Sequence, residues 1–103
     1  MTPSQECPVC EGLAQILECG LEEITTKLTE SGSSFATHTV CSNCGTLYAS
    51  TLLLEMIQGE QHRQTRGTLS KAIRAKNDAG TKVLLVTRED ILKCIRDFEI
   101  SNQ

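Results

Sequence analysis

Two cysteine pairs share one spacing. Cys7 and Cys10 enclose two residues in CPVC, and Cys41 and Cys44 repeat the spacing in CSNC. The chain turns within such a motif so that both sulfurs point at one centre and backbone N–H groups can donate to them. Zinc accepts four thiolates at the corners of a tetrahedron, and four protein ligands leave no open position. The two pairs therefore predict one structural Zn2+ per chain.

Two other chemistries use the same motif. Iron could occupy the four sulfurs, and CSNCGTLY resembles a rubredoxin turn. A rubredoxin, however, surrounds its iron with packed aromatic rings, and this chain has only Phe35, Tyr48 and Phe98. A thioredoxin-like redox motif needs a strand before the cysteines and a helix after them. The alternation that follows Cys10 predicts strands, which favours metal binding over redox chemistry.

Three further residues have ligand chemistry but receive no role. Cys19 lies close in sequence to the first pair and could replace a ligand or lie near it. Cys94 stands beside an apolar helix face, where a buried cysteine behaves as a small hydrophobic residue. His38, three residues before Cys41, could support the site from outside, but an ordinary strand histidine is the simpler interpretation.

Composition indicates the compartment. No apolar run is long enough to span a bilayer, and the first residues lack the basic and apolar regions of a signal peptide. We therefore expect a cytoplasmic protein without a membrane segment. Six cysteines in a reducing compartment favour metal binding or catalysis over disulfides.

The first half alternates in the manner of strands. We predict strands over residues 13–18, 22–28 and 35–40, so that a β-hairpin separates the two cysteine turns. Residues 1–49 would form this metal-binding module, in which Pro8 constrains the first turn and Gly45 permits the second.

Helical patterns dominate residues 50–103. We predict a helix from Ser50 that Gly59 or Gly67 breaks, and a second helix from Thr68 to Asp78 that ends at Gly80. A short strand follows over 82–86. Thr87 then begins a helix to about Glu99 with a capping box. This last helix should bury four apolar side chains, those of Ile91, Leu92, Ile95 and Phe98. The two modules would pack as one compact α+β domain.

With the motifs in place, residues 7–48 resemble a zinc ribbon, in which two cysteine turns lie at the tips of hairpins joined by antiparallel strands. The resemblance implies that Cys7, Cys10, Cys41 and Cys44 are the four zinc ligands. Ribbons occur in proteins of many functions, so the resemblance indicates a metal and a fold rather than an activity. The acidic loops here differ from those of many nucleic-acid-binding ribbons, and residues 50–103 resemble no family.

Charge is unevenly distributed along the chain. Residues 1–60 carry eight acidic residues and one basic residue, whereas residues 61–103 carry nine basic and five acidic residues. On a helix, Arg63 and Arg74 lie within about 20° of one line, with Arg66 and Lys71 beside it. This basic stripe could contact phosphates, dock on the acidic half or be solvated.

No catalytic constellation is recognisable, so we expect a protein that is not an enzyme. The leading hypothesis is a zinc-binding adaptor or regulatory subunit that binds a protein partner. Self-association through the apolar segment Leu52–Ile57 is one form of this hypothesis. The alternative is nucleic-acid binding through the basic helix 63–76.

Overall fold

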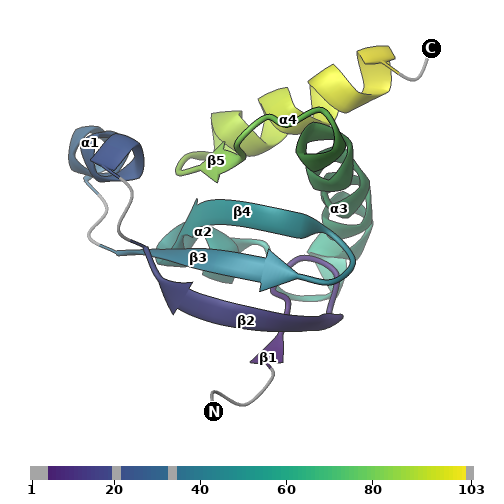
Figure 1. Ribbon diagram of the computed structural model, residues 1–103, viewed down its shortest axis with the longest axis horizontal. Helices are drawn as coiled ribbons and strands as arrows, with labels where there is room; N and C mark the ends of the chain where they lie inside the picture. The colour runs from purple at the N-terminus through teal and green to yellow at the C-terminus, as the bar shows by residue number, and fades with distance from the viewer. Residues whose placement is uncertain (1–4, 20–21, 33–34, 102–103) are drawn as a thin grey trace.

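The computed structural model describes residues 5–19, 22–32 and 35–101. Strands β1 to β5 form one sheet in sequence order (Figure 1). The first four strands pair antiparallel, whereas β5 runs parallel to β4. The strands are β1 (Gln5–Glu6), β2 (Leu13–Glu18), β3 (Ala36–Cys41), β4 (Gly45–Ser50) and β5 (Leu84–Leu85). The helices are α1 (Glu22–Ser31), α2 (Thr51–Met56), the 3-10 turn η1 (Glu60–His62), α3 (Arg63–Asp78) and α4 (Arg88–Ser101). The predicted α+β class is confirmed.

The two faces of the sheet carry separate cores. Alternation along β4 directs Leu47 and Ala49 to one face, where both are fully buried with residues of α2 and α3. Tyr48 points to the other face and packs with Ile24 and Leu28 of α1. The larger core joins residues from both predicted modules, and it contains three of the four paired cysteines. The division of the chain at residue 49 stays a prediction.

The strand predicted over residues 22–28 is wrong, because this segment belongs to α1. Ile24 and Leu28 are four residues apart, so they share one face of a helix as readily as one face of a strand. Both are buried, whereas the threonines between them are exposed. The hydroxyl of Thr29 bonds to the carbonyl of Thr25, as threonine does within helices. Instead of the predicted hairpin, β2 pairs with β3, and α1 lies between these two strands in the sequence.

The break between α2 and α3 falls at Gly59, whose φ is 105°. Ser50 caps α2 as its side chain accepts from the backbone of Leu53 at 3.4 Å. Helix α3 begins at Arg63, five residues before the predicted start at Thr68, and passes through Gly67 without interruption. A single glycine costs a helix only about 1 kcal/mol relative to alanine, which the packing of α3 offsets.

Arg66 holds the start of α3 in place. Its guanidinium donates to the carbonyl oxygens of Ile57 and Gly59, both at 2.7 Å. The residue is buried, and a buried cation must find such partners. This side chain therefore satisfies the backbone between α2 and α3, a role that charge patterning alone did not predict.

The capping box of α4 is present. The Thr87 hydroxyl accepts from the backbone N–H of Asp90, and the Asp90 carboxylate accepts from the N–H groups of Val86 and Thr87. Ile91 is buried as predicted, but Leu92 is exposed. Cys94 occupies the buried position instead, because residues three and four apart line one helix face and Leu92 lies off that line.

Some apolar side chains remain at the surface. Leu13, Leu17 and Val40 are exposed on adjoining strands β2 and β3, a surface we call the β2–β3 face. Within the predicted self-association segment, Leu53, Leu54 and Ile57 are buried, whereas Leu52 and Met56 are exposed. None of the helices in the described ranges is long and apolar enough to cross a membrane.

Candidate metal centre

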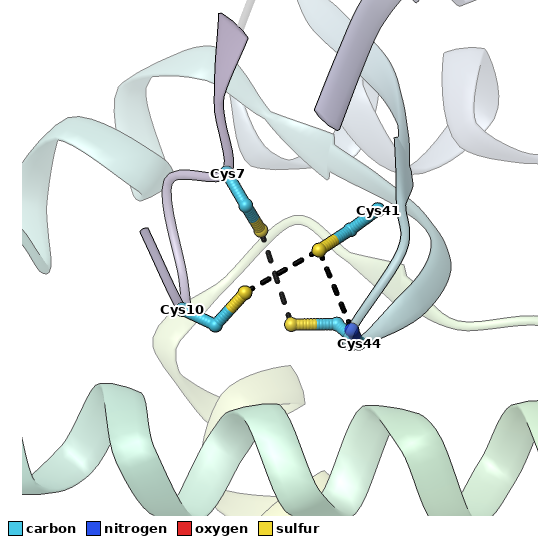
Figure 2. Close-up of side chains that lie close together, drawn as sticks. All are labelled: Cys7, Cys10, Cys41 and Cys44. Carbon is cyan, nitrogen blue, oxygen red and sulfur yellow. Dashed lines mark hydrogen bonds between the residues drawn. The ribbon is translucent and has the colours of Figure 1, made fainter. Parts of the chain in front are cut away.

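Four cysteine sulfurs converge between two turns (Figure 2). All four lie within 4.8 Å of one another. The Cys10 and Cys41 sulfurs are 3.3 Å apart, and those of Cys7 and Cys44 are 3.9 Å apart. A metal at 2.3 Å from each of four tetrahedral sulfurs separates them by about 3.8 Å. The cluster therefore has the dimensions of a four-thiolate metal site, and its sulfurs are too far apart for disulfides.

The first turn connects β1 to β2. The N–H of Cys7 donates to the carbonyl of Gly12 at 2.8 Å, and the N–H of Glu11 donates to the carbonyl of Cys7 at 2.9 Å. The N–H of Gly12 points at the Cys10 sulfur, 3.4 Å away. The backbone thus closes the loop and offers a donor to a ligand atom, as the motif predicts.

The second turn connects β3 to β4. Cys41 is the last residue of β3 and pairs with Gly45 at the start of β4. The N–H groups of Asn43 and Cys44 both point at the Cys41 sulfur, at 3.3 and 3.4 Å. Gly45 has a φ of 99°, a conformation that favours glycine. The hairpin therefore fixes the two sulfurs of this pair with little freedom.

Helix α3 runs past the site and contacts the second turn at two points. The Ser70 hydroxyl lies 3.0 Å from the Cys44 sulfur, and both groups are buried. The Asn77 side chain accepts from the N–H of Thr46 at 2.9 Å and donates to its carbonyl at 3.0 Å. Neither residue was predicted to support the site. The sequence does offer one signal, since helical periodicity places Ser70 on the same helix face as Arg63 and Arg74.

Hydrogen bonding and burial shift the pKa values of three of the four clustered cysteines. A hydrogen bond with Cys44 lowers the pKa of Cys7 to about 5, while burial opposes this effect. The same contact, together with burial, raises the pKa of Cys44. Burial raises the pKa of Cys41. The hydrogen bond between Cys7 and Cys44 therefore favours a thiolate at Cys7 and a thiol at Cys44. A bound divalent cation would remove the competition between these sulfurs for protons, because it would stabilise all four thiolates at once.

The remaining cysteines and His38 lie outside the cluster. Cys19 packs beside the buried residues of α1, and Cys94 belongs to the larger core. Burial raises the pKa of Cys94, which keeps it a neutral thiol. The His38 ring stacks on Tyr48 with ring centres 4.4 Å apart. This histidine therefore belongs to the sheet face that α1 partly covers rather than to the sulfur site.

A cavity with a volume of about 600 Å3 adjoins the four-cysteine cluster. Its walls come from the two cysteine turns, from α3 and from α4. All four residues of the predicted basic stripe line it: Arg63, Arg66, Lys71 and Arg74. Arg66 is largely committed to backbone carbonyls, whereas the other three side chains are exposed.

Comparisons with protein-family models, with curated proteins and with solved structures find no match to this chain. The chemistry of the site therefore carries the functional argument.

Proposed function

We propose that the protein is a zinc-dependent interaction module of the zinc-ribbon type, without enzymatic activity, that binds a protein partner. The observation that carries the metal assignment is the closed set of four sulfurs within 4.8 Å. Zinc is favoured over iron because this set matches a structural zinc site, while the chain has few aromatic residues to shield iron. With four protein ligands, the metal has no position for a substrate.

The contacts around the sulfurs support a structural role. A bound thiolate carries no proton, so the Ser70 hydroxyl would donate to the Cys44 sulfur. Such outer contacts orient metal ligands. Because Ser70 belongs to α3, the metal would link the helical half to the two turns. Metal binding would then contribute directly to folding.

A protein partner is supported by the β2–β3 face. Leu17 pairs with His38 across the two strands, and Val40 pairs with Gln15, so Leu17 and Val40 are diagonal neighbours. Leu13 is 70% exposed on the same side of β2. Clustered exposed apolar side chains mark interaction surfaces more often than scattered ones do. This surface lies on the sheet, away from the basic side of α3.

A pair of cysteine variants tests the metal assignment. Cys41→Ser removes one ligand, and Cys19→Ser removes a thiol outside the cluster. We expect Cys41→Ser to lose zinc and to give a circular dichroism spectrum with less structure than that of wild type. Cys19→Ser should keep both the zinc and the wild-type spectrum. Equal zinc content in the two variants would contradict the assignment.

A second pair tests the partner surface. Zinc-loaded protein is used to capture partners from lysate, and Val40→Lys is compared with Leu92→Lys, which changes an exposed apolar residue on α4. We expect Val40→Lys to lose the partners that wild type captures, and Leu92→Lys to retain them. Identical capture by wild type and Val40→Lys would contradict binding through the β2–β3 face.

A further inference from the structure

The cavity beside the four-cysteine cluster, which we call the basic groove, has a wall of cationic side chains. Arg63, Lys71 and Arg74 line it from one side of α3. The first and last of these are 11 residues apart, which is about 16 Å along a helix axis. A single small anion could meet only part of such a row. A ligand with regularly repeated negative charges could meet all of it.

These three cations are available. Arg63 lies 3.8 Å from Glu60, and Arg74 lies 3.4 Å from Asp78, but all four side chains are more than half exposed. Exposed ion pairs contribute little free energy, so a ligand can replace them at small cost. In the described part of the chain, Lys71 forms no ion pair.

Gly67 lies in the same wall and supplies an independent observation. Glycine within a helix costs about 0.5–1 kcal/mol relative to alanine. A Cβ at Gly67 would have no heavy atom within 4 Å outside the atoms of its own turn, so packing within the chain does not demand glycine. The absent side chain leaves bare backbone between the cations. Such a gap permits the main chain of a ligand to approach α3 closely.

Negative charges near the cavity oppose the binding of an anionic ligand. Glu11 and the partly buried Cys10 also line the cavity, and four thiolates around a divalent metal would carry a net charge of about −2. They reduce the attraction without reversing it at the exposed ends of the arginines, since screening in water is strong over about 10 Å. We therefore expect modest affinity with marked salt dependence.

We propose that this groove binds the sugar–phosphate backbone of a nucleic acid, with Arg63, Lys71 and Arg74 contacting phosphates and Gly67 leaving room for the strand. Nucleic acid is favoured over an acidic peptide because every nucleotide carries a phosphate, whereas only some side chains of a peptide are acidic. Each strand of duplex DNA thus presents a negative charge about every 3.4 Å along the helix axis. This binding site is separate from the β2–β3 face, so it goes beyond the protein partner proposed above.

The direct test is fluorescence anisotropy of zinc-loaded protein with a labelled 20-nucleotide oligo(dT) and a mixed-sequence 20-base-pair duplex. Three phosphate contacts predict a slope of log K against log salt of about −2 to −3. Lys71→Ala should reduce that slope by about 0.7–0.9 and weaken binding about three- to tenfold near 0.1 M salt. Arg96→Ala, which removes an exposed cation of α4 outside the cavity, should leave binding unchanged.

Gly67 gives a second test, in which a substitution introduces a negative charge. Gly67→Glu should abolish measurable binding because it places a carboxylate between the cations, whereas Gly67→Ala should retain at least part of the affinity. Zinc content and circular dichroism are measured for every variant. A failure of the metal assignment is then distinguished from a failure of nucleic-acid binding.

Three results would overturn the proposal. The first is no binding of either oligonucleotide at 50 mM salt by folded, zinc-loaded protein. The second is binding that Gly67→Glu and a Lys71→Ala, Arg74→Ala double variant leave intact. The third is polyglutamate competing as well as oligo(dT) at equal charge, which would assign the groove to acidic peptides.

Discussion

At the residue scale, Ser70 and Asn77 connect α3 to the second cysteine turn. Ser70 contacts a sulfur, and Asn77 continues the hydrogen bonding of the turn by pairing with both backbone groups of Thr46. Asn77 also donates to the carbonyl of Ile73 in its own helix at 2.9 Å. The geometry of the second cysteine turn thus depends on side chains far away in sequence.

Ser70→Ala should weaken zinc binding about 10-fold or more, because the Cys44 thiolate would lose its hydroxyl donor. The measurement is competition against a chromophoric chelator at pH 7. Thr68→Ala is the control, since among the described residues that hydroxyl donates to the carbonyl of Gln64 within α3 and not to a cysteine. Equal zinc affinities for the two variants would show that the Ser70 contact does not support the site.

Gly45→Ala should destabilise the protein by more than Gly80→Ala does. Both glycines have positive φ, at 99° and 77°, so each substitution introduces strain of about 1–3 kcal/mol. At Gly45 the new Cβ would also lie 2.7 Å from the Asn77 side chain, whereas at Gly80 it meets nothing within 4 Å. Urea unfolding with saturating zinc measures both. Equal losses would show that Asn77 moves aside freely.

At the element scale, the sequence predicted those elements whose signals are local. The cysteine turns, β2, β3 and the start of α4 follow from motif spacing, alternation and a capping box. Helix α1 was missed because Ile24 and Leu28 satisfy both periods, and tertiary packing of α1 on the sheet decided between them. The start of α3 was missed because it depends on Arg66 contacting carbonyls seven and nine residues earlier.

Asp90 gives a pH-dependent prediction for α4. Burial opposes ionisation of this carboxyl, but hydrogen bonds from Val86 and Thr87 and the charge of Lys27 outweigh burial and lower its pKa. The folded state thus favours the carboxylate. This stabilisation is fully present above the unfolded pKa of about 3.9 and is lost as pH falls through the folded pKa.

Asp90→Asn should therefore reduce the free energy of unfolding by about 1 kcal/mol at pH 7, and the difference from wild type should narrow below about pH 4. Urea unfolding across the pH series measures this. Asp78→Asn, which alters an exposed carboxylate paired with Arg74, should have little effect. A difference for Asp90→Asn that is constant with pH would contradict the role of its charge.

At the scale of the whole molecule, the four-cysteine cluster lies where the sheet meets α3, and the basic groove opens beside it. That the four cysteines lie together was predictable, because the two motifs have the local spacing that brings sulfurs to a common centre. The groove was not, because its walls come from turns and helices that only the tertiary fold brings together. Arg66 illustrates the limit, since its place in a charge pattern could not show that it is buried.

The burial of the segment Leu52–Ile57 bears on the predicted self-association. Three apolar residues of Leu52–Ile57 pack inside the chain, which leaves Leu52 and Met56, 58% and 49% exposed. Two such side chains supply only a small part of the roughly 1,200 Å2 that stable interfaces bury. We therefore expect a monomer at micromolar concentration by light scattering. A dimer that Leu52→Ser dissociates would contradict this expectation and restore self-association through α2.

In the function proposed above, one zinc ion, held by four thiolates, organises the two turns and the helix beside them. Titration of Zn2+ into reduced, metal-free protein, followed by calorimetry and circular dichroism, tests it most directly. We predict a single break at about one equivalent, with gain of structure complete at the same point. A metal-free protein that is already fully folded, or a titration without a break near one equivalent, would contradict this role of zinc.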